Sequence, residues 1–274
     1  MKKTSIALSI IFAFSFATHA QTVGSANIMG YTKVSKPGNG YLTIVGVPFN
    51  TTSNKLNDLV DPLQFTGHDS DINQADQLIF FDANTQEYST YALYDIRSYG
   101  SEYAPNTAWK AVADFSYGGA SFNPTIEPGS AVWLVGKGST TDTNVLMAGN
   151  VVLSSSRTNN VVAGLQLLAN PFSEAVALTN LSLHVNATGH ASDINQADQV
   201  IVFDTETQSY VTYALYDISS YGAEYEIYTG WKNITDFTFG GAYADAILKI
   251  GQGFWVKANN QFTWVETNKY LDNL

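Results

Sequence analysis

Hydrophobic positions along this chain recur mainly at the two-residue period of β-strands, and no long window has the period of a helix. In EYSTYALYD (87–95) and SYVTYALYD (209–217), successive residues alternate between two faces, which indicates half-buried strands. The short β-branched and aromatic runs LIFFD (78–82) and VIVFD (200–204) precede them, with turn residues between. Each run and the strand after it therefore predict a β-hairpin.

Further apolar segments complete the predicted strands. Residues 41–49 and 161–169 are apolar runs that end at or just before a Pro-Phe step, and residues 126–135 and 248–257 enter a strand through a glycine turn. Short strands with turn signals about every ten residues are typical of an all-β sandwich or barrel. SDINQAD (70–76 and 192–198) is compatible with one helical turn that has Ser70 or Ser192 as its N-cap.

The chain repeats itself with a shift of 122 residues. Residues 66–103 and 188–225 are identical at 29 of 38 positions, and SDINQADQ is unchanged between 70–77 and 192–199. The same shift pairs Trp109 with Trp231 and Trp133 with Trp255. We therefore predict an all-β chain of two tandem, related, jelly-roll-like β-sandwich units, each of about 120 residues, over 21–146 and 147–267. A leader (1–20) precedes them and a short tail (268–274) follows.

Similarity between the copies is uneven, since the first third of each has diverged almost completely. One explanation is a constraint that holds the central block in both copies. The other is a recent recombination that copied this block. The sequence leaves both open.

The second copy resembles a module of secreted surface proteins from Bacteroidetes- and Verrucomicrobia-type bacteria. The resemblance is carried by Asn170-Pro171-Phe172, by Asp198-Gln199 and by GQGFWV at 251–256. The first copy departs from the pattern, with Val47 in place of the Asn and SAV at 130–132 in place of Gln-Gly-Phe. The resemblance implies an exported β-sandwich of surface or matrix proteins, without an established chemistry.

The first twenty residues have the layout of a secretory signal peptide. Lys2 and Lys3 precede an apolar run, and Thr18-His19-Ala20 ends it, which predicts cleavage after Ala20. The run is too short to cross a bilayer, which takes roughly 20 apolar residues. We therefore expect a secreted or cell-surface protein without membrane insertion, with the periplasm as an alternative location.

Charge and composition exclude several function classes. The net charge is −11, and removal of the leader takes two lysines and no acid, which leaves about −13. A chain this acidic does not neutralise phosphates, so we expect no nucleic-acid partner. Because the chain has no cysteine, thiol catalysis and zinc–thiolate sites are excluded.

The two SDINQAD loops are candidate calcium sites, because hard cations prefer oxygen ligands. The candidate ligands are Asp71, Asn73 and Asp76 in the first copy and Asp193, Asn195 and Asp198 in the second. The spacing is not that of an EF-hand, since Gln74 and Phe80 occupy the places of its glycine and glutamate. The alternative is that these side chains cap backbone N–H groups in a turn. We therefore expect either no cofactor or calcium.

Aromatic residues that recur in both copies are candidates for a sugar-binding face. The candidate ligand-binding residues are Tyr91, Tyr94, Trp109, Tyr213, Tyr216 and Trp231. Exposed rings of this kind stack on the C–H face of a sugar. The alternative is that the rings pack in the core and keep only their polar ends near the surface.

Two further interpretations of the central block concern contact and catalysis. If the blocks of the two copies faced each other, each residue would meet its twin across an approximate twofold axis, and both copies would be constrained together. His68 and His190 lie beside acidic residues, as acid–base catalysis requires. No nucleophile elbow, histidine cluster or phosphate loop accompanies them, so we expect no enzyme.

Together these patterns predict a secreted or cell-surface, non-enzymatic structural or adhesive protein of a matrix, surface layer or fibre. Its expected partners are copies of itself or other surface proteins, because duplicated weak sites gain from effective concentration. The alternative is a carbohydrate-binding protein with two aromatic sites, supported by calcium.

Overall fold

A computed structural model describes residues 28–269 and 271, so the predicted leader lies outside the described residues. Antiparallel strands dominate, and the predicted all-β class is confirmed. The described residues contain one α-helix, the four-residue α1 (Leu56–Leu59). The remaining helical segments are 3-10 turns: η1 Pro62–Gln64, η2 Arg97–Tyr99, η3 Ser101–Asn106, η4 Val112–Asp114, η5 Leu178–Asn180, η6 Ser182–Val185, η7 Ser219–Tyr221, η8 Ala223–Tyr228 and η9 Ile234–Asp236.

The first half of the structure (residues 28–151) is built on a six-stranded antiparallel sheet in the order β2-β8-β4-β5-β6-β7. Its strands are β2 Leu42–Gly46, β8 Ala131–Val135, β4 Gln77–Asp82, β5 Glu87–Tyr94, β6 Ala108–Ala111 and β7 Ser121–Phe122. β4 and β5 form the hairpin expected from the alternating pattern.

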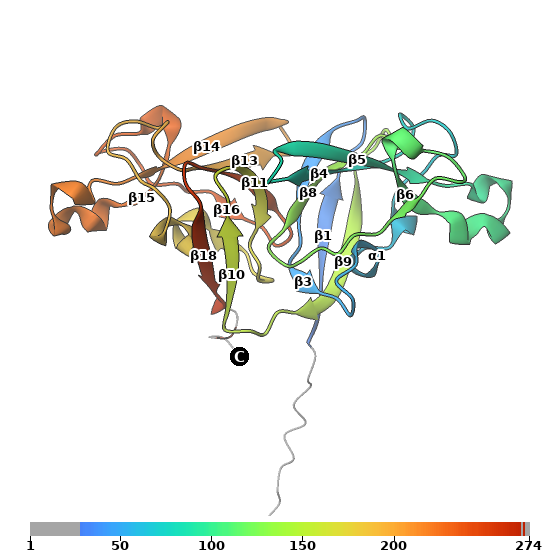
Figure 1. Ribbon diagram of the computed structural model, residues 1–274, viewed down its shortest axis with the longest axis horizontal. Coiled ribbons are helices and arrows are strands. Elements are labelled where there is room, and N and C mark those ends of the chain that lie inside the picture. Colours follow the sequence, from blue (N-terminus) through green and yellow to red (C-terminus); the bar gives the residue numbers. More distant parts are fainter. Residues whose placement is uncertain (1–27, 270, 272–274) are drawn as a thin grey trace, which may run out of the picture.

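The second half (residues 152–269) has a five-stranded sheet in the order β11-β17-β13-β14-β15. Its strands are β11 Gly164–Ala169, β17 Gly253–Ala258, β13 Gln199–Asp204, β14 Ser209–Tyr216 and β15 Gly230–Asn233. This order matches the first five strands of the other sheet, element by element. The two halves lie side by side along the long axis of the molecule (Figure 1).

Smaller sheets cover one face of each large sheet. They are β1 (Met29–Lys36) with β9 (Thr143–Val151) and β3 (Phe49–Asn50), β10 (Ser156–Val161) with β18 (Phe262–Thr267), and β12 (Val176–Ala177) with β16 (Ile247–Leu248). The predicted boundary between residues 146 and 147 falls inside β9, which pairs with β1 as far as Asn150. The strand that ends the first half therefore runs several residues past the predicted boundary.

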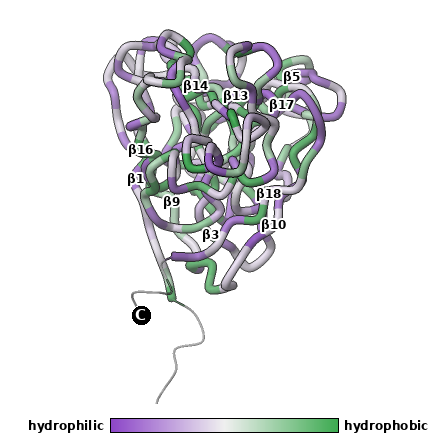
Figure 2. The backbone as a smooth tube through the Cα atoms, turned by 90° about the vertical axis from the view of Figure 1, so that its left-hand side faces the viewer, coloured by the Kyte–Doolittle hydropathy of each residue, from purple (hydrophilic) through white to green (hydrophobic). Residues whose placement is uncertain are grey.

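Each half has a separate hydrophobic core between its sheets. Leu93 and Trp109 are central in the first core, and Leu215, Trp231 and Trp264 in the second. In Figure 2, which views the molecule from one end of its long axis, hydrophobic stretches run through the strands and hydrophilic ones through the outer loops. The sandwich-like packing thus follows from the two-residue period in the sequence.

A third apolar cluster joins the two halves, and we call it the interface core. Its buried members are Ile44, Ala131, Trp133, Leu167, Ala169, Phe203 and Trp255. In β8, Val132 and Leu134 point into the core of the first half while Ala131 and Trp133 point into the interface core. Because both faces of this strand are covered, its sequence AVWLV is apolar at every position.

Contacts across the interface core are reciprocal. The ring of Trp133 meets Phe203 edge-on at 4.9 Å, and its twin Trp255 meets Phe81 at 4.8 Å. Near the axis, Gly46 N donates to Gly251 O at 2.9 Å, while Ala169 N donates to Gly129 O at 2.8 Å. The same positions of each copy therefore make the same contacts in exchanged roles, as an approximate twofold axis requires.

Gly46 and Gly253 show how closely the halves approach. A Cβ on Gly46 would lie 2.3 Å from the Cβ of Ala169, and a Cβ on Gly253 would lie 2.6 Å from that of Ala131. Each glycine thus faces the alanine that occupies its own place in the other copy. A larger side chain at either position would push the two sheets apart.

Two glutamines close the edges of the interface. Gln208 accepts a hydrogen bond from Leu42 N and donates one to Leu42 O, both at 2.9 Å. Gln86 makes the same pair of bonds with Leu165, also at 2.9 Å. Since β2 and β11 are edge strands, each glutamine side chain satisfies backbone groups that a further strand would otherwise pair.

Trp255→Ala should lower the free energy of unfolding by about 3–5 kcal/mol, because it leaves a hole in a packed core. Trp133→Ala should cost a similar amount, since the two rings make twin contacts. The measurement is urea unfolding followed by circular dichroism. Tyr41→Ala is the control, because this ring is largely exposed and its loss should cost less than about 0.5 kcal/mol. A cost below about 1 kcal/mol for both tryptophans would contradict a stabilising interface.

Candidate functional site

The aromatic residues predicted to bind ligand lie mainly in the interior. Trp109 and Trp231 are 0 % exposed, and Tyr94, Tyr213 and Tyr216 are also buried. The partly buried sixth member, Tyr91, is stacked on Phe122 with 3.5 Å between ring centres. These rings are packed in the interior, as in the alternative to sugar binding given above, and none of them presents an open face on which a sugar could stack.

A buried lysine in each half holds a projecting loop. Lys232 Nζ donates to the carbonyls of Thr238 (2.6 Å) and Phe239 (3.0 Å), and it lies 4.2 Å from the ring centre of Tyr216. Lys110 makes the equivalent contacts in the first half. Burial lowers the pKa of both lysines. The ammonium groups thus fix loops that also pack through Phe115 against Tyr94 and through Phe237 against Tyr216.

We call the segments 97–106 and 112–120, and their counterparts 219–228 and 234–242, the end loops. Segments 97–106 and 219–228 reach the two extremes of the long axis, and 112–120 and 234–242 lie next to them on the inner, upper side (Figure 1). They carry the exposed aromatic residues Tyr99 (67 %), Tyr117 (65 %), Tyr221 (71 %) and Phe239 (56 %). Sequence reasoning counted Tyr99 and Tyr221 in the repeat but missed Tyr117 and Phe239. The signal for these two was a ring placed directly before each Gly-Gly turn.

The SDINQAD loops are hydrogen-bonded turns, so the prediction of a helical turn capped by Ser70 or Ser192 is wrong. Asp71 does the capping: its Oδ1 accepts from Asn73 N and its Oδ2 from Gln74 Nε2, both at 2.9 Å. These bonds lower the pKa of Asp71. Asp193 makes the same two bonds in the second half. The physical reason is that a carboxylate two residues before an N–H group closes an Asx turn.

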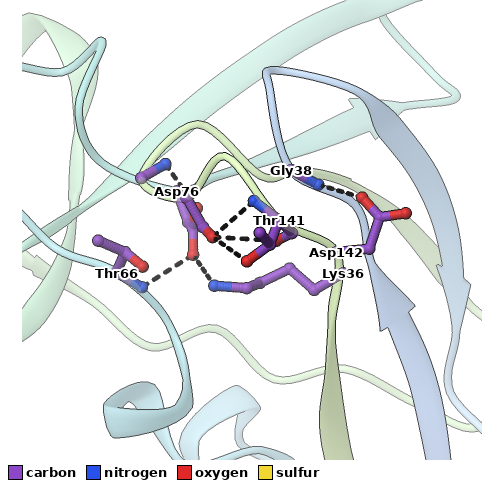
Figure 3. Close-up of polar contacts among 8 residues, drawn as sticks. Lys36, Gly38, Thr66, Asp76, Thr141 and Asp142 are labelled. Carbon is purple, nitrogen blue, oxygen red and sulfur yellow. Dashed lines mark hydrogen bonds and ion pairs between the residues drawn. The ribbon is translucent and has the colours of Figure 1, made fainter.

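Asp76 is buried and fully bonded (Figure 3). Its Oδ2 accepts from Lys36 Nζ at 2.6 Å and from Thr66 N at 2.8 Å, and its Oδ1 accepts from Gly138 N at 3.0 Å. This carboxylate therefore joins three chain segments. The ammonium group of Lys36 takes the position beside the carboxylate that a metal ion would need.

Asp198 occupies the matching place in the second half but has a different environment. Its two oxygens accept from Thr188 N and Asn259 N, both at 2.7 Å. Across the part of the chain that the structure describes, no cation lies within ion-pair distance of Asp198. Burial raises the pKa of this carboxyl. Asp198 is thus a buried acid that neutral hydrogen-bond donors stabilise, chiefly the backbone N–H groups of Thr188 and Asn259.

The metal candidates do not converge on one point. Within residues 28–269 and 271, no group of three or more His, Cys, Asp or Glu side chains is arranged to hold a metal ion. The two histidines beside these loops are turn caps as well: His68 Nδ1 accepts from Asp71 N at 2.9 Å, and His190 Nδ1 accepts from Asp193 N at 2.8 Å. Both imidazoles thus stabilise a turn.

Contact between the copies does occur, but SDINQADQ is not part of it. The contacts come from the hairpins that follow, through Phe81, Gln86 and their twins Phe203 and Gln208. The central block is therefore held in two ways. Its first part builds the turn and the buried aspartate, and its second part meets the other half.

Family models, curated proteins and solved structures were compared with the chain, and none of them matches. The resemblance to the bacterial surface module therefore stays a prediction. Among the described residues, no helix has the length and apolar character that a membrane crossing takes.

Calcium is expected to leave the melting temperature unchanged. The oxygens of Asp71, Asp76, Asp193 and Asp198 already accept hydrogen bonds, and Lys36 lies beside one of them. The measurement is a pair of thermal melts, one with millimolar calcium and one with EDTA. A melting temperature that rises with calcium and falls with EDTA would restore the metal hypothesis.

Asp198→Asn should change how stability depends on pH. Because burial raises the pKa of Asp198 above its ordinary value of about 3.9, the folded state binds this proton more tightly than the unfolded chain. Stability from this group is therefore present below about pH 3.9 and is lost as pH rises through the raised pKa. The wild-type chain should gain stability relative to the variant as the pH is lowered from about 7 to about 4.

Urea unfolding at several pH values measures this difference, and Asp193→Asn is the matched control. The bond from Asn195 N, chiefly, lowers the pKa of Asp193. The sign is therefore opposite, and the advantage of the wild type over this control should shrink as pH falls below about 3.9. A difference between wild type and Asp198→Asn that is the same at every pH would contradict the assignment.

Proposed function

We propose that this protein is a secreted or cell-surface, non-enzymatic structural or adhesive protein that connects copies of itself through its two ends. Support comes from the end loops, which present the same kind of exposed aromatic surface at both extremes of the long axis. Aromatic residues are enriched where protein surfaces bind each other.

The contact between the two halves fixes the position of one set of end loops relative to the other. The interface core and the reciprocal backbone bonds hold the two halves together as one body. The end loops therefore keep a fixed separation and direction. When both ends of a rigid body carry equivalent contacts, repeated end-to-end association extends into an open assembly such as a fibre or a layer.

The end loops are themselves anchored, which lowers the entropy cost of using them for contact. Lys110 and Lys232 bind loop carbonyls from below, and Asp114 and Asp236 accept from loop N–H groups. A surface that is ordered before binding loses less conformational freedom on association. Few aromatic residues per end then suffice for a weak, repeated contact.

The alternative of a carbohydrate-binding protein with two equal aromatic sites is supported less well. Five of the six rings assigned to those sites are buried, and the sixth is stacked on Phe122. The assignment as a non-enzyme remains part of the proposal, with His68 and His190 both engaged in turns.

Loss of the exposed rings should break the assembly. Wild-type mature protein (residues 21–274) is expected to form oligomers whose mean mass grows with concentration. The double variant Tyr117→Ser and Phe239→Ser should remain monomeric, because an exposed aromatic anchor at a protein contact contributes about 1–2 kcal/mol or more. Phe239→Ser alone should stop at dimers, joined through the unchanged end. Light scattering after size exclusion measures all three.

The matched control is the double variant Tyr31→Ser and Tyr41→Ser. These tyrosines are also exposed, at 74 % and 52 %, but they lie outside the end loops. Their loss should leave the mass distribution unchanged. A wild-type protein that stays monomeric at high concentration, or a control that dissociates as fully as the end-loop variant, would contradict the proposal.

A further inference from the structure

The second half contains a cavity of about 420 Å³ beside Trp231. It lies where η5, η6, β15 and the segment before β16 meet. Its lining includes Thr179, His184, Thr229, Trp231, Tyr243 and Ala244. Cavities of this size are typical of small-molecule sites.

The first half fills the equivalent space with phenylalanine rings. Phe122 pairs with Trp109 in the strand register and packs against the first core, and the 122-residue shift puts Ala244 in its place. Phe65 meets the Trp109 ring edge-on at 5.0 Å, and the same shift replaces it with Ala187. Methyl groups thus stand in the second half where two rings lie beside the tryptophan of the first half, while the order of the strands that carry the tryptophan is retained.

Such replacements in a packed interior normally cost stability, because the surrounding structure closes a hole only in part. A ligand that binds the folded state offsets that cost. Because the strand order around Trp231 is kept although the rings are missing, we favour use of the space over simple loss of packing. Nothing comparable is needed around Trp109, where the rings are present.

The polar groups of the lining define the ligand. His184 Nδ1 lies 2.8 Å from Leu181 O, and since a carbonyl only accepts, Nδ1 carries a proton and, in that tautomer, Nε2 is an acceptor. Thr229 Oγ1 donates to Asp217 at 3.0 Å, which leaves its lone pairs open. The indole N–H groups of Trp231 and of its twin Trp109 are both buried without a hydrogen-bond partner, so the acceptors of His184 and Thr229 are the groups that distinguish this cavity.

The lining side chains carry no fixed charge, so the cavity suits a neutral ligand. The acceptors of His184 and Thr229 call for a ligand with donors, and hydroxyl groups supply them. The Tyr243 ring, which is 43 % exposed, offers an apolar face to the C–H groups of a ring.

We infer that this cavity binds one neutral, hydroxylated ring of the size of a single sugar residue. The hydroxyls donate to His184 Nε2 and Thr229, and the apolar face of the ring packs against Tyr243. The site is single and asymmetric, and its lining shares only Trp231 with the six rings predicted from the sequence. It is independent of the end-to-end contact proposed above.

The test uses mature wild-type protein and four free monosaccharides, namely D-glucose, D-galactose, D-mannose and N-acetyl-D-glucosamine. Saturation-transfer NMR and thermal melts at millimolar sugar should detect binding of at least one, with a raised melting temperature. Ala244→Phe restores the ring that the first half has, and it should abolish binding. The matched control is Phe122→Ala in the first half, which should leave the Kd unchanged.

A second variant keeps the test decisive if Ala244→Phe does not fold, as judged by near-ultraviolet circular dichroism. His184→Ala leaves the cavity open but removes an acceptor, and it should raise the Kd by about tenfold or more. The site is refuted if none of the four sugars binds the wild type, or if folded Ala244→Phe or His184→Ala binds as the wild type does. Light scattering of Ala244→Phe should still show the assembly of the wild type, so the two proposals fail or succeed separately.

Discussion

The structure depends on the burial of two tryptophans, Trp133 and Trp255, between its halves. Each half has its own core, but each also presents an apolar outer face on its large sheet. Covering that face with the equivalent face of the other half removes both from water at once. Everything proposed for the ends of the molecule relies on this joint, because it turns two sandwiches into one body with a defined length.

Hydrogen bonds fix the relative alignment of the two halves, which hydrophobic burial alone does not determine. Apolar surfaces attract without preferring one register, whereas the glutamine side chains on Leu42 and Leu165 fit a single alignment. Gln86 and Gln208 have positive φ angles of 59° and 52°, a conformation that their turns and these hydrogen bonds support. The close approach of Gly46 to Ala169 also restricts the two halves to one alignment.

The hairpins were predictable from the alternating and β-branched segments, but burial along β5 and β14 does not alternate: both strands are exposed at their start and buried on both faces at their end. The contact made by AVWLV (131–135) was not predictable, because an apolar strand has the same sequence pattern whether its second face meets the other half or the core of its own half. The sequence also does not distinguish a buried tyrosine in a strand from an exposed tyrosine in a loop. Only the structure shows which tyrosines are exposed. The cavity beside Trp231 is lined by Ala244 in the place of Phe122, a difference that lies outside the strongly conserved block 66–103 and 188–225 and drew no notice in the sequence.

The order of synthesis gives the interface core a further consequence. The first half leaves the ribosome before its partner exists, with Ile44 and Trp133 uncovered. Until the second half has folded against it, the nascent chain exposes this apolar face and can aggregate with other copies of itself. A molecule cut short after residue 151 would keep that exposed face for its lifetime, so truncation should lead to aggregation rather than to a smaller working protein.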